Sequence, residues 1–193
     1  MKIFVIRHGE TPSNAARIVQ TPETPLSARG IEQAERLARR LENSGIEQIL
    51  SSDLPRAMMT AQRLEIATGA AVSHDPLLQE RNFGDVRGTA YSDLEGDLFA
   101  ADFSPPNGES WATFDARVTR AWEFVADVAT ATTGNLAVVT HGLVCVSLAR
   151  HHFSLRGDLV PPRHFENTSV TIVDGTPPWV VATLNCNAHL DAD

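Results

Sequence analysis

Two stretches of the sequence share one pattern, KIFVIRHG at residues 2–9 and LAVVTHG at residues 136–142. In each stretch, a short apolar run leads directly into a histidine that is followed by a glycine. An apolar run of this length, without alternating polar residues, is typical of a strand that is buried on both faces of a parallel sheet. The two stretches therefore predict two core strands, each with a histidine at its carboxyl end.

The remaining segments alternate between helical and strand-like patterns. Ser27 is a typical N-cap, and an apolar stripe at helical spacing follows it as far as Leu41. The longest such stripe begins at Trp111 and extends over about five turns. Further helices are expected from Pro55 to Thr68, over 142–152 and, more weakly, over 91–99; strands over 46–51, 71–73, 169–173 and 179–184; and a loop over 12–25. This alternation predicts an α/β sandwich with a mostly parallel sheet and a hairpin at the end.

Length and composition are those of one ordinary globular domain. The chain has 193 residues, of which 42% are hydrophobic and 21% charged, and no linker or repeat divides it, so we expect a single domain over residues 1–193. The formal net charge of −8 repels polyanions, which argues against binding to nucleic acid or to an anionic membrane surface. The N-terminal apolar run is too short for a signal peptide or a membrane span. The cytoplasm is therefore the expected location.

Four polar residues stand where predicted strands give way to loops. They are Arg7, His8, Arg56 and His141. Ligands of open α/β sheets bind beyond the carboxyl ends of the strands, and arginine matches the geometry of phosphate oxygens. The glycines after the two histidines, Gly9 and Gly142, let backbone N–H groups come close to an anion. The pattern predicts a pocket for a dianion in an otherwise acidic protein.

A fifth element is Glu80, which lies between two leucines and an aromatic residue in the stretch 77–84. Both a functional acid and a plain surface carboxylate fit this context. Four further residues are either surface residues or contacts for a second anionic group on the ligand: Arg81, Arg87, Arg163 and His164.

Two other features have structural interpretations. His151 and His152 indicate the end of a helix and not a metal site, because adjacent residues on a helix point in different directions. Cys145 and Cys186 show no C-x-x-C spacing, so we expect two reduced, buried thiols.

Together these residues form an ordered series of motifs. The series is Arg7-His8-Gly9-Glu10-Thr11 with Asn14 and Arg17; Pro25-Leu26-Ser27 with Gly30 and Gln33-Ala34; Ser51-Ser52-Asp53-Leu54 with Arg56-Ala57 and Thr60-Ala61; Glu80 with Phe83-Gly84 and Gly88; Gly108-Glu109-Ser110 with Phe114 and Arg117; and Val139-Thr140-His141-Gly142. It covers nearly the whole chain and resembles the histidine phosphatase superfamily, in the branch that includes cofactor-dependent phosphoglycerate mutases. Arg-His-Gly alone is a weak signal, whereas all the blocks in this order are a specific one.

The resemblance implies a fold, a reaction and a set of roles. The fold is a three-layer α/β/α sandwich, and the reaction is that of a histidine acid phosphatase-type phosphoric monoester hydrolase, without metal or cofactor. His8 would be the nucleophile that accepts the phosphoryl group, and Glu80 would protonate the leaving oxygen. The phosphoryl oxygens would be held by Arg7, Arg56 and His141, with Asn14 assisting.

The segment 89–107 favours hydrolysis over mutation. Mutases of the family carry a longer, basic segment here, whereas this one has no lysine or arginine and has four acids, Asp93, Glu95, Asp97 and Asp102. If this acidic segment forms a wall of the substrate pocket, it would retain a bisphosphate poorly. We therefore expect a phosphatase whose partner is a small phosphorylated metabolite. A phosphoglycerate mutase, a phosphohistidine-protein phosphatase and a catalytically silent phosphate-binding module stay as alternatives. The sequence names neither the substrate nor the oligomeric state, and a homodimer is kept as a prediction.

Overall fold

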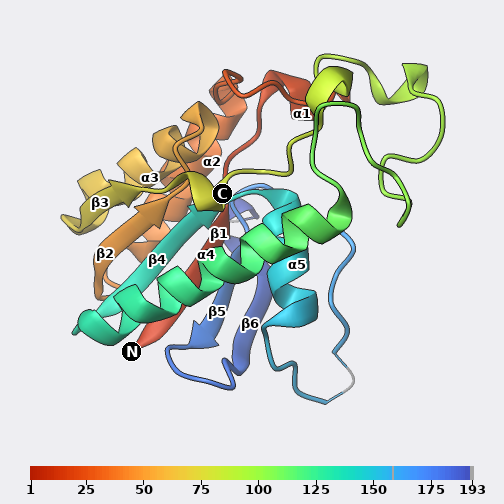
Figure 1. Ribbon diagram of the computed structural model, residues 1–193. Helices are drawn as coiled ribbons and strands as arrows, with labels where there is room; N and C mark the ends of the chain where they lie inside the picture. Colours follow the sequence, from red (N-terminus) through yellow and green to blue (C-terminus); the bar gives the residue numbers. More distant parts are fainter. Residues whose placement is uncertain (158, 192–193) are drawn as a thin grey trace.

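The computed structural model describes residues 1–157 and 159–191 (Figure 1). Within these residues, one sheet contains the strands β1 (Lys2–Arg7), β2 (Ile46–Ser51), β3 (Ala71–His74), β4 (Asn135–Thr140), β5 (Val170–Asp174) and β6 (Val181–Cys186). The α-helices are α1 (Pro12–Ala16), α2 (Ala28–Leu41), α3 (Pro55–Thr68), α4 (Trp111–Ala131) and α5 (Gly142–His151). Short 3-10 turns lie at 76–78, 84–86, 91–93 and 188–190.

The two histidine-bearing strands, β1 and β4, lie side by side and parallel at the centre of the sheet. The strand order is β3-β2-β4-β1-β5-β6, and the register places Arg7 opposite Thr140. His8 and His141 therefore leave the sheet together at its carboxyl edge. Strand β5 runs antiparallel to β1 and to β6, which confirms the hairpin, and the other neighbouring strands are parallel.

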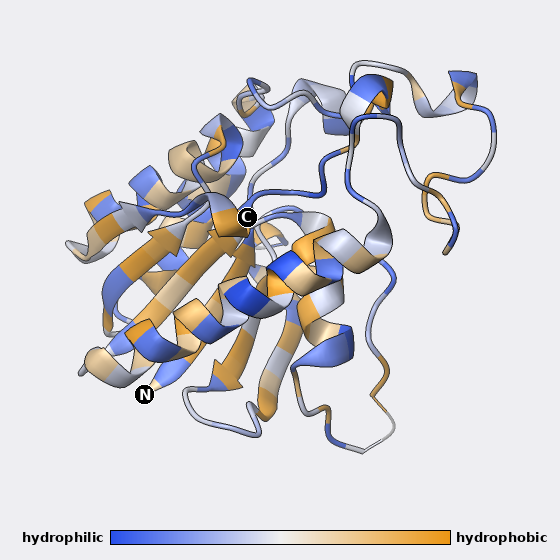
Figure 2. Ribbon diagram, in the orientation of Figure 1, coloured by the Kyte–Doolittle hydropathy of each residue, from blue (hydrophilic) through white to orange (hydrophobic). Residues whose placement is uncertain are grey.

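Helices cover both faces of the sheet, as Figure 1 shows. Ile3 of β1 belongs to a core cluster with α4 and α5, whereas Phe4 belongs to a second cluster with α2 and α3. Successive strand residues point to opposite faces. Because both faces are covered, the inner residues of β1 and β4 are all apolar, and only their end residues are polar (Figure 2). The aromatic stripe of α4 lies in the first cluster, where Phe114 and Trp122 are buried. These layers confirm the α/β/α sandwich.

The segment 12–25, predicted as a loop, begins with helix α1. Thr11 and Asn14 form a capping box in which the Asn14 N–H donates to Thr11 Oγ1 (3.0 Å) and the Thr11 N–H donates to Asn14 Oδ1 (3.3 Å). Pro12 occupies the first turn, where its fixed φ angle favours a helix. These local signals are strong enough to form one short helix that apolar periodicity does not reveal.

The helix predicted over 91–99 is wrong, since only Tyr91–Asp93 forms a single 3-10 turn. Gly96 has a φ angle of +87°, which ends any helix at that point. Leu94 and Leu98 instead pack, with Phe83, in a small third cluster under this segment. A separate apolar contact, and not helical periodicity, explains the leucine spacing.

The cysteines are both free, but only Cys145 is buried, and Cys186 is partly exposed, so the expectation of two buried thiols is wrong for Cys186. Helix α5 ends at His151, as expected. In the part of the chain that the structure describes, no helix is long and apolar enough to cross a membrane. The same part shows no group of three or more His, Cys, Asp or Glu residues that could hold a metal ion.

Candidate active site

The imidazoles of His8 and His141 face each other at the carboxyl edge of the sheet. Their ring centroids are 5.0 Å apart, and the ring planes are inclined by 59°. The backbone N–H of His8 donates to the Thr140 carbonyl (2.9 Å), which continues the β1–β4 pairing beyond the strands. Both side chains are almost fully excluded from solvent. The parallel pairing of two buried strands is therefore what creates the histidine pair.

The hydrogen bond of His8 fixes its tautomer. Nδ1 lies 2.7 Å from the Gly9 carbonyl oxygen, which can only accept, so Nδ1 carries the proton. In the neutral ring, the lone pair is then on Nε2. Burial, and next the positive charges of Arg56 and Arg7, hold the pKa of His8 well below the ordinary histidine value. These causes favour a neutral His8 imidazole whose unprotonated nitrogen is Nε2.

Two buried guanidinium groups flank the histidines. Arg7 is 6% exposed and Arg56 is 2% exposed, values that are rare for arginine. Arg7 Nη1 donates to the Phe165 carbonyl and contacts His164 Nε2 (3.2 Å). Arg56 Nη1 donates to the Thr21 carbonyl (3.2 Å). Burial lowers the pKa of Arg56 to about 10. This value is still well above neutral pH, so the guanidinium stays charged.

These residues hold three donors that have no partner among the described residues. The buried atoms are Arg7 Nε, Arg56 Nε and His141 Nδ1. His141 Nε2 lies 2.9 Å from Ser52 Oγ, and we assign the Ser52 hydroxyl as the donor of this bond, since its oxygen also accepts from the Leu54 N–H. The His141 Nδ1–H is then a donor. Buried donors of this kind need an acceptor, and a dianion such as a phosphoryl group satisfies all three.

Glu80 lies near these histidines and arginines, and hydrogen bonds hold both its side chain and its backbone. Its carboxylate accepts from the N–H groups of Arg81 (3.0 Å) and Leu143 (3.1 Å), and it lines the same cavity as Arg7 and Arg56. The Arg117 guanidinium donates to the Glu80 carbonyl (3.2 Å) and is itself held by Glu109, with N–O distances of 2.7 and 2.8 Å. The bidentate pair is the rigid kind of arginine–carboxylate contact.

Gly142 and Asn14 complete the predicted set. A Cβ at Gly142 would lie in van der Waals contact with the Arg7 side chain, 3.4 Å from Nε, so Gly142 borders the unpartnered nitrogen. Asn14 lines the cavity, and its Oδ1 lies 3.4 Å from Asn167 Nδ2. The structure thus brings every predicted site residue to one edge of the sheet.

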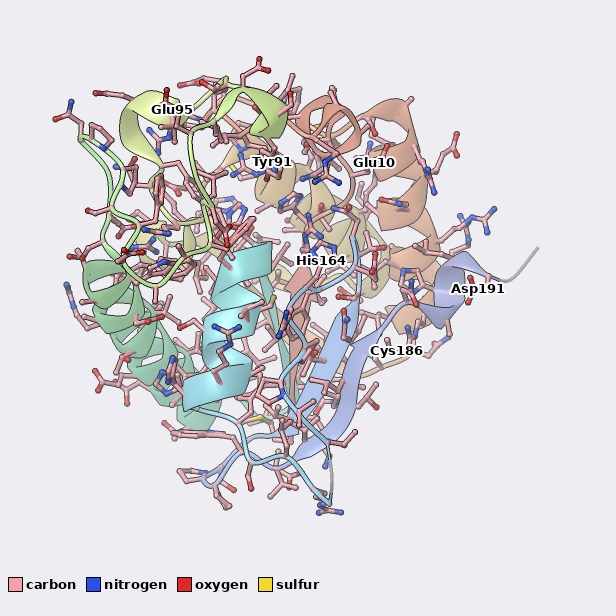
Figure 3. The ribbon with its side chains drawn as sticks, turned by 90° about the vertical axis from the view of Figure 1, so that its right-hand side faces the viewer. Glu10, Tyr91, Glu95, His164, Cys186 and Asp191 are labelled. Atoms are coloured by element: carbon pink, nitrogen blue, oxygen red, sulfur yellow. The ribbon has the colours of Figure 1, made fainter. Side chains whose placement is uncertain are left out.

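Five of the predicted site residues line a cavity of about 1020 Å³, whereas His8 and His141 are buried and do not line it. Its lining includes seven arginines and three acids, which makes it a cationic basin in a protein of net charge −8. Of the four acids in 89–107, only Asp97 lines the cavity, so the acidic wall expected from the sequence is wrong in this respect. Tyr91 and His164 both line the cavity, and in Figure 3 Glu95 lies farther from His164 than Tyr91 does.

The four residues considered for a second anion divide into two kinds. All four line the cavity, and Arg87, Arg163 and His164 are partly or largely exposed. Arg81 is 2% exposed and forms part of the scaffold: its guanidinium stacks on Trp111 at 3.9 Å and donates to the carbonyls of Glu109 (3.0 Å) and Phe103 (2.7 Å). The surface interpretation is therefore wrong for Arg81.

Sequence reasoning missed the residues that contact the two histidines through hydrogen bonds. Ser52 contacts His141, and Asn167 Nδ2 donates to the His8 carbonyl (3.0 Å). Ser52 stands in a quoted motif, but nothing in its spacing shows which imidazole it meets. Asn167 is more than 150 positions from His8, so only the tertiary fold can bring them together.

Fold and site together define a class: an α/β/α protein whose paired imidazoles and paired guanidinium groups are built for phosphoryl transfer. The family model of the histidine phosphatase superfamily (branch 1) matches residues 3–187. The chain belongs to this superfamily.

Relatives within the family carry different names. A probable phosphoglycerate mutase GpmB from Shigella boydii is 30% identical over 208 residues, covering 100% of this chain and 96% of that protein. A putative alpha-ribazole-5'-P phosphatase from Escherichia coli is similar in structure, with a TM-score of 0.79, 27% identity and 97% coverage of both chains. A mycobacterial glucosyl-3-phosphoglycerate phosphatase has a TM-score of 0.77 at 26% identity and 90% coverage of both chains.

Proposed function

We propose that this protein is a metal-independent phosphomonoesterase that acts on a small phosphorylated metabolite through a phosphohistidine on His8. The observation that carries the proposal is the His8–Gly9 hydrogen bond, which leaves the Nε2 lone pair free beside three unpartnered donors. A nucleophile and charge-stabilising groups at the same edge of the sheet are what phosphoryl transfer requires.

In the first step, His8 Nε2 attacks phosphorus, and the bond between phosphorus and the ester oxygen breaks. The leaving oxygen takes a proton from Glu80. Arg7, Arg56 and His141 donate to the equatorial oxygens, where negative charge is spread in the transition state. In the second step, water attacks the phosphohistidine, Glu80 takes a proton from the water, and the P–N bond breaks. Inorganic phosphate and neutral His8 result.

The first experiment is phosphate release from a panel of phosphomonoesters in excess chelator, with His8→Ala beside the wild type. We expect release by the wild type only, and a phosphoenzyme that is labile in acid and stable in alkali. Full turnover by His8→Ala would remove His8 from the mechanism. Release that stops in chelator would contradict the metal-independent step.

A second experiment tests the acid. Glu80→Gln is expected to slow alkyl phosphates far more than aryl phosphates, because a good leaving group needs little proton donation. Equal slowing of both classes would exclude Glu80 from leaving-group protonation.

The cavity also favours a leaving group that carries negative charge of its own. Gly142, Val146 and Arg150 line it from one face of α5, and Arg150 lies roughly 12 Å along the helix from Gly142. The side chains of Arg87, Arg150 and Arg163 form no hydrogen bond or ion pair with residues that the structure describes. A carboxylate or second phosphate on the substrate would meet these charges, and Arg150→Gln should raise KM for such esters but not for neutral ones.

The mutase alternative is separated by its products. A mutase converts 3-phosphoglycerate to 2-phosphoglycerate when 2,3-bisphosphoglycerate is present, whereas a phosphatase releases inorganic phosphate. The segment 89–107 brings no cation to the cavity, and this supports hydrolysis. Isomerisation without net phosphate release would contradict it.

A further inference from the structure

The C-terminal turn carries a histidine that the proposed reaction does not use. His189 lies in the 3-10 turn Ala188–Leu190, which packs against α2. Figure 3 labels Cys186 and Asp191, which lie on either side of this turn beside α2. His189 Nδ1 is 3.1 Å from Arg40 Nη1, and His189 Nε2 is 3.0 Å from Thr168 Oγ1. The ring therefore bridges a helix and a loop that are far apart in the sequence.

The chemistry of Arg40 determines which nitrogen of His189 donates and which accepts. A guanidinium only donates, so His189 Nδ1 must accept, and the proton of the neutral ring is on Nε2. Nε2–H then donates to Thr168 Oγ1, and the Thr168 hydroxyl donates to the Asn167 carbonyl (2.7 Å). Burial, and next the charge of Arg40, lower the pKa of His189 to about 4, in agreement with a neutral ring.

The far end of the bridge is the backbone of the nucleophile. The carbonyl of His8 accepts from the Thr168 N–H (3.3 Å) and from Asn167 Nδ2 (3.0 Å). Thr168 is fully buried and has a φ angle of +55°. Left-handed backbone is rare for a β-branched residue and persists only where the surrounding contacts enforce it. The hydrogen bond from His189 is one of those contacts.

We propose that His189 is a positioning residue for the phosphoryl transfer: through Thr168 it holds the 167–168 turn against the backbone carbonyl of His8 and thereby fixes the attacking imidazole. The inference rests on the proposed role of His8 as nucleophile. Catalysis needs the nucleophile within a small distance of its productive position, so a loosened turn should slow the chemical step more than substrate binding.

The test is a double-mutant cycle on the full-length protein with an aryl phosphate as substrate. We expect His189→Leu and Thr168→Val each to lower kcat about tenfold with KM within about twofold of wild type. Because the two residues act in series, the double variant should lose no more than the larger single loss. His189→Gln should recover most of kcat, because its amide nitrogen can take the place of Nε2 as donor. The exposed His74→Leu is the matched control and should keep wild-type kinetics.

A substrate-free measurement separates this inference from the proposed function. Amide hydrogen exchange at Thr168 should become faster in His189→Leu, because its N–H bond to His8 loses support. Wild-type kcat in folded His189→Leu, additive losses in the double variant, or unchanged Thr168 exchange would each overturn the inference. If His189→Leu does not fold, wild-type kcat in Thr168→Val would overturn it. If the wild type itself shows no turnover, the proposed function is contradicted instead. The exchange experiment needs no substrate, so it still tests whether His189 supports the Thr168–His8 hydrogen bond.

Discussion

The buried histidine pair makes a quantitative prediction about stability at acidic pH. Burial is the main cause that holds the pKa values of His8 and His141 well below the ordinary value, and the charge of Arg56 adds to it. In the unfolded chain both residues titrate near pH 6.5. As the pH falls below that value, the unfolded state takes up protons that the folded state cannot bind. The free energy of unfolding must therefore decrease.

As long as both histidines stay neutral in the folded protein, the size of the effect follows from the pKa of histidine in the unfolded chain alone. Between pH 7.5 and pH 5.0, each histidine should cost about 2 kcal/mol of the free energy of unfolding, or about 4 kcal/mol for the pair. The loss begins near pH 6.5 and ends only where the folded site itself becomes protonated. Carboxylates with lowered pKa values, such as Glu109, add a further loss of the same sign at lower pH.

The assay is urea unfolding at several pH values between 7.5 and 5.0. His8→Gln should remove about 2 kcal/mol of the pH-dependent loss, whatever it does to stability at pH 7.5. His74→Gln, at an exposed position, is the matched control and should keep the wild-type pH dependence. If His8→Gln shows the same pH dependence as the wild type, His8 is not held neutral in the folded state, and the argument for its nucleophilic form fails.

Three further predictions concern single side chains. Arg56→Gln should lower kcat/KM by roughly 10² or more, since it removes a donor to the transition state; steady-state kinetics check this, and a loss under threefold would contradict it. Gly142→Ala should weaken inhibition by inorganic phosphate, because the new Cβ, 3.4 Å from Arg7 Nε, would occupy space beside this unpartnered donor; unchanged inhibition would show that phosphate does not use that space. Arg81→Met should lower the free energy of unfolding by about 2 kcal/mol, because buried carbonyls lose their donor; urea unfolding measures this, with Arg120→Met, at an exposed position of α4, as control.

The site residues were predictable from the sequence because each one stands next to a local signal. His8 and His141 follow apolar runs that can only be buried strands, and Arg56 begins the helix after a third strand. The same reasoning failed where a contact, and not periodicity, sets the structure. Leu94 and Leu98 have helical spacing but pack in a separate cluster around Gly96. Arg81 has the composition of a surface residue but stacks on Trp111.

By itself, the sequence determined the α/β class, the series of motifs and which polar residues meet at the candidate site, because hydrophobic periodicity and strand-end residues are local properties. Only the tertiary structure decided that β1 and β4 are neighbours, which places the two imidazole rings 5.0 Å apart. It also decided the tautomer of His8 and the contact of Thr168 with both His8 and His189. The physical reason is that strand pairing, desolvation and hydrogen-bond direction depend on groups that only the folded chain brings together.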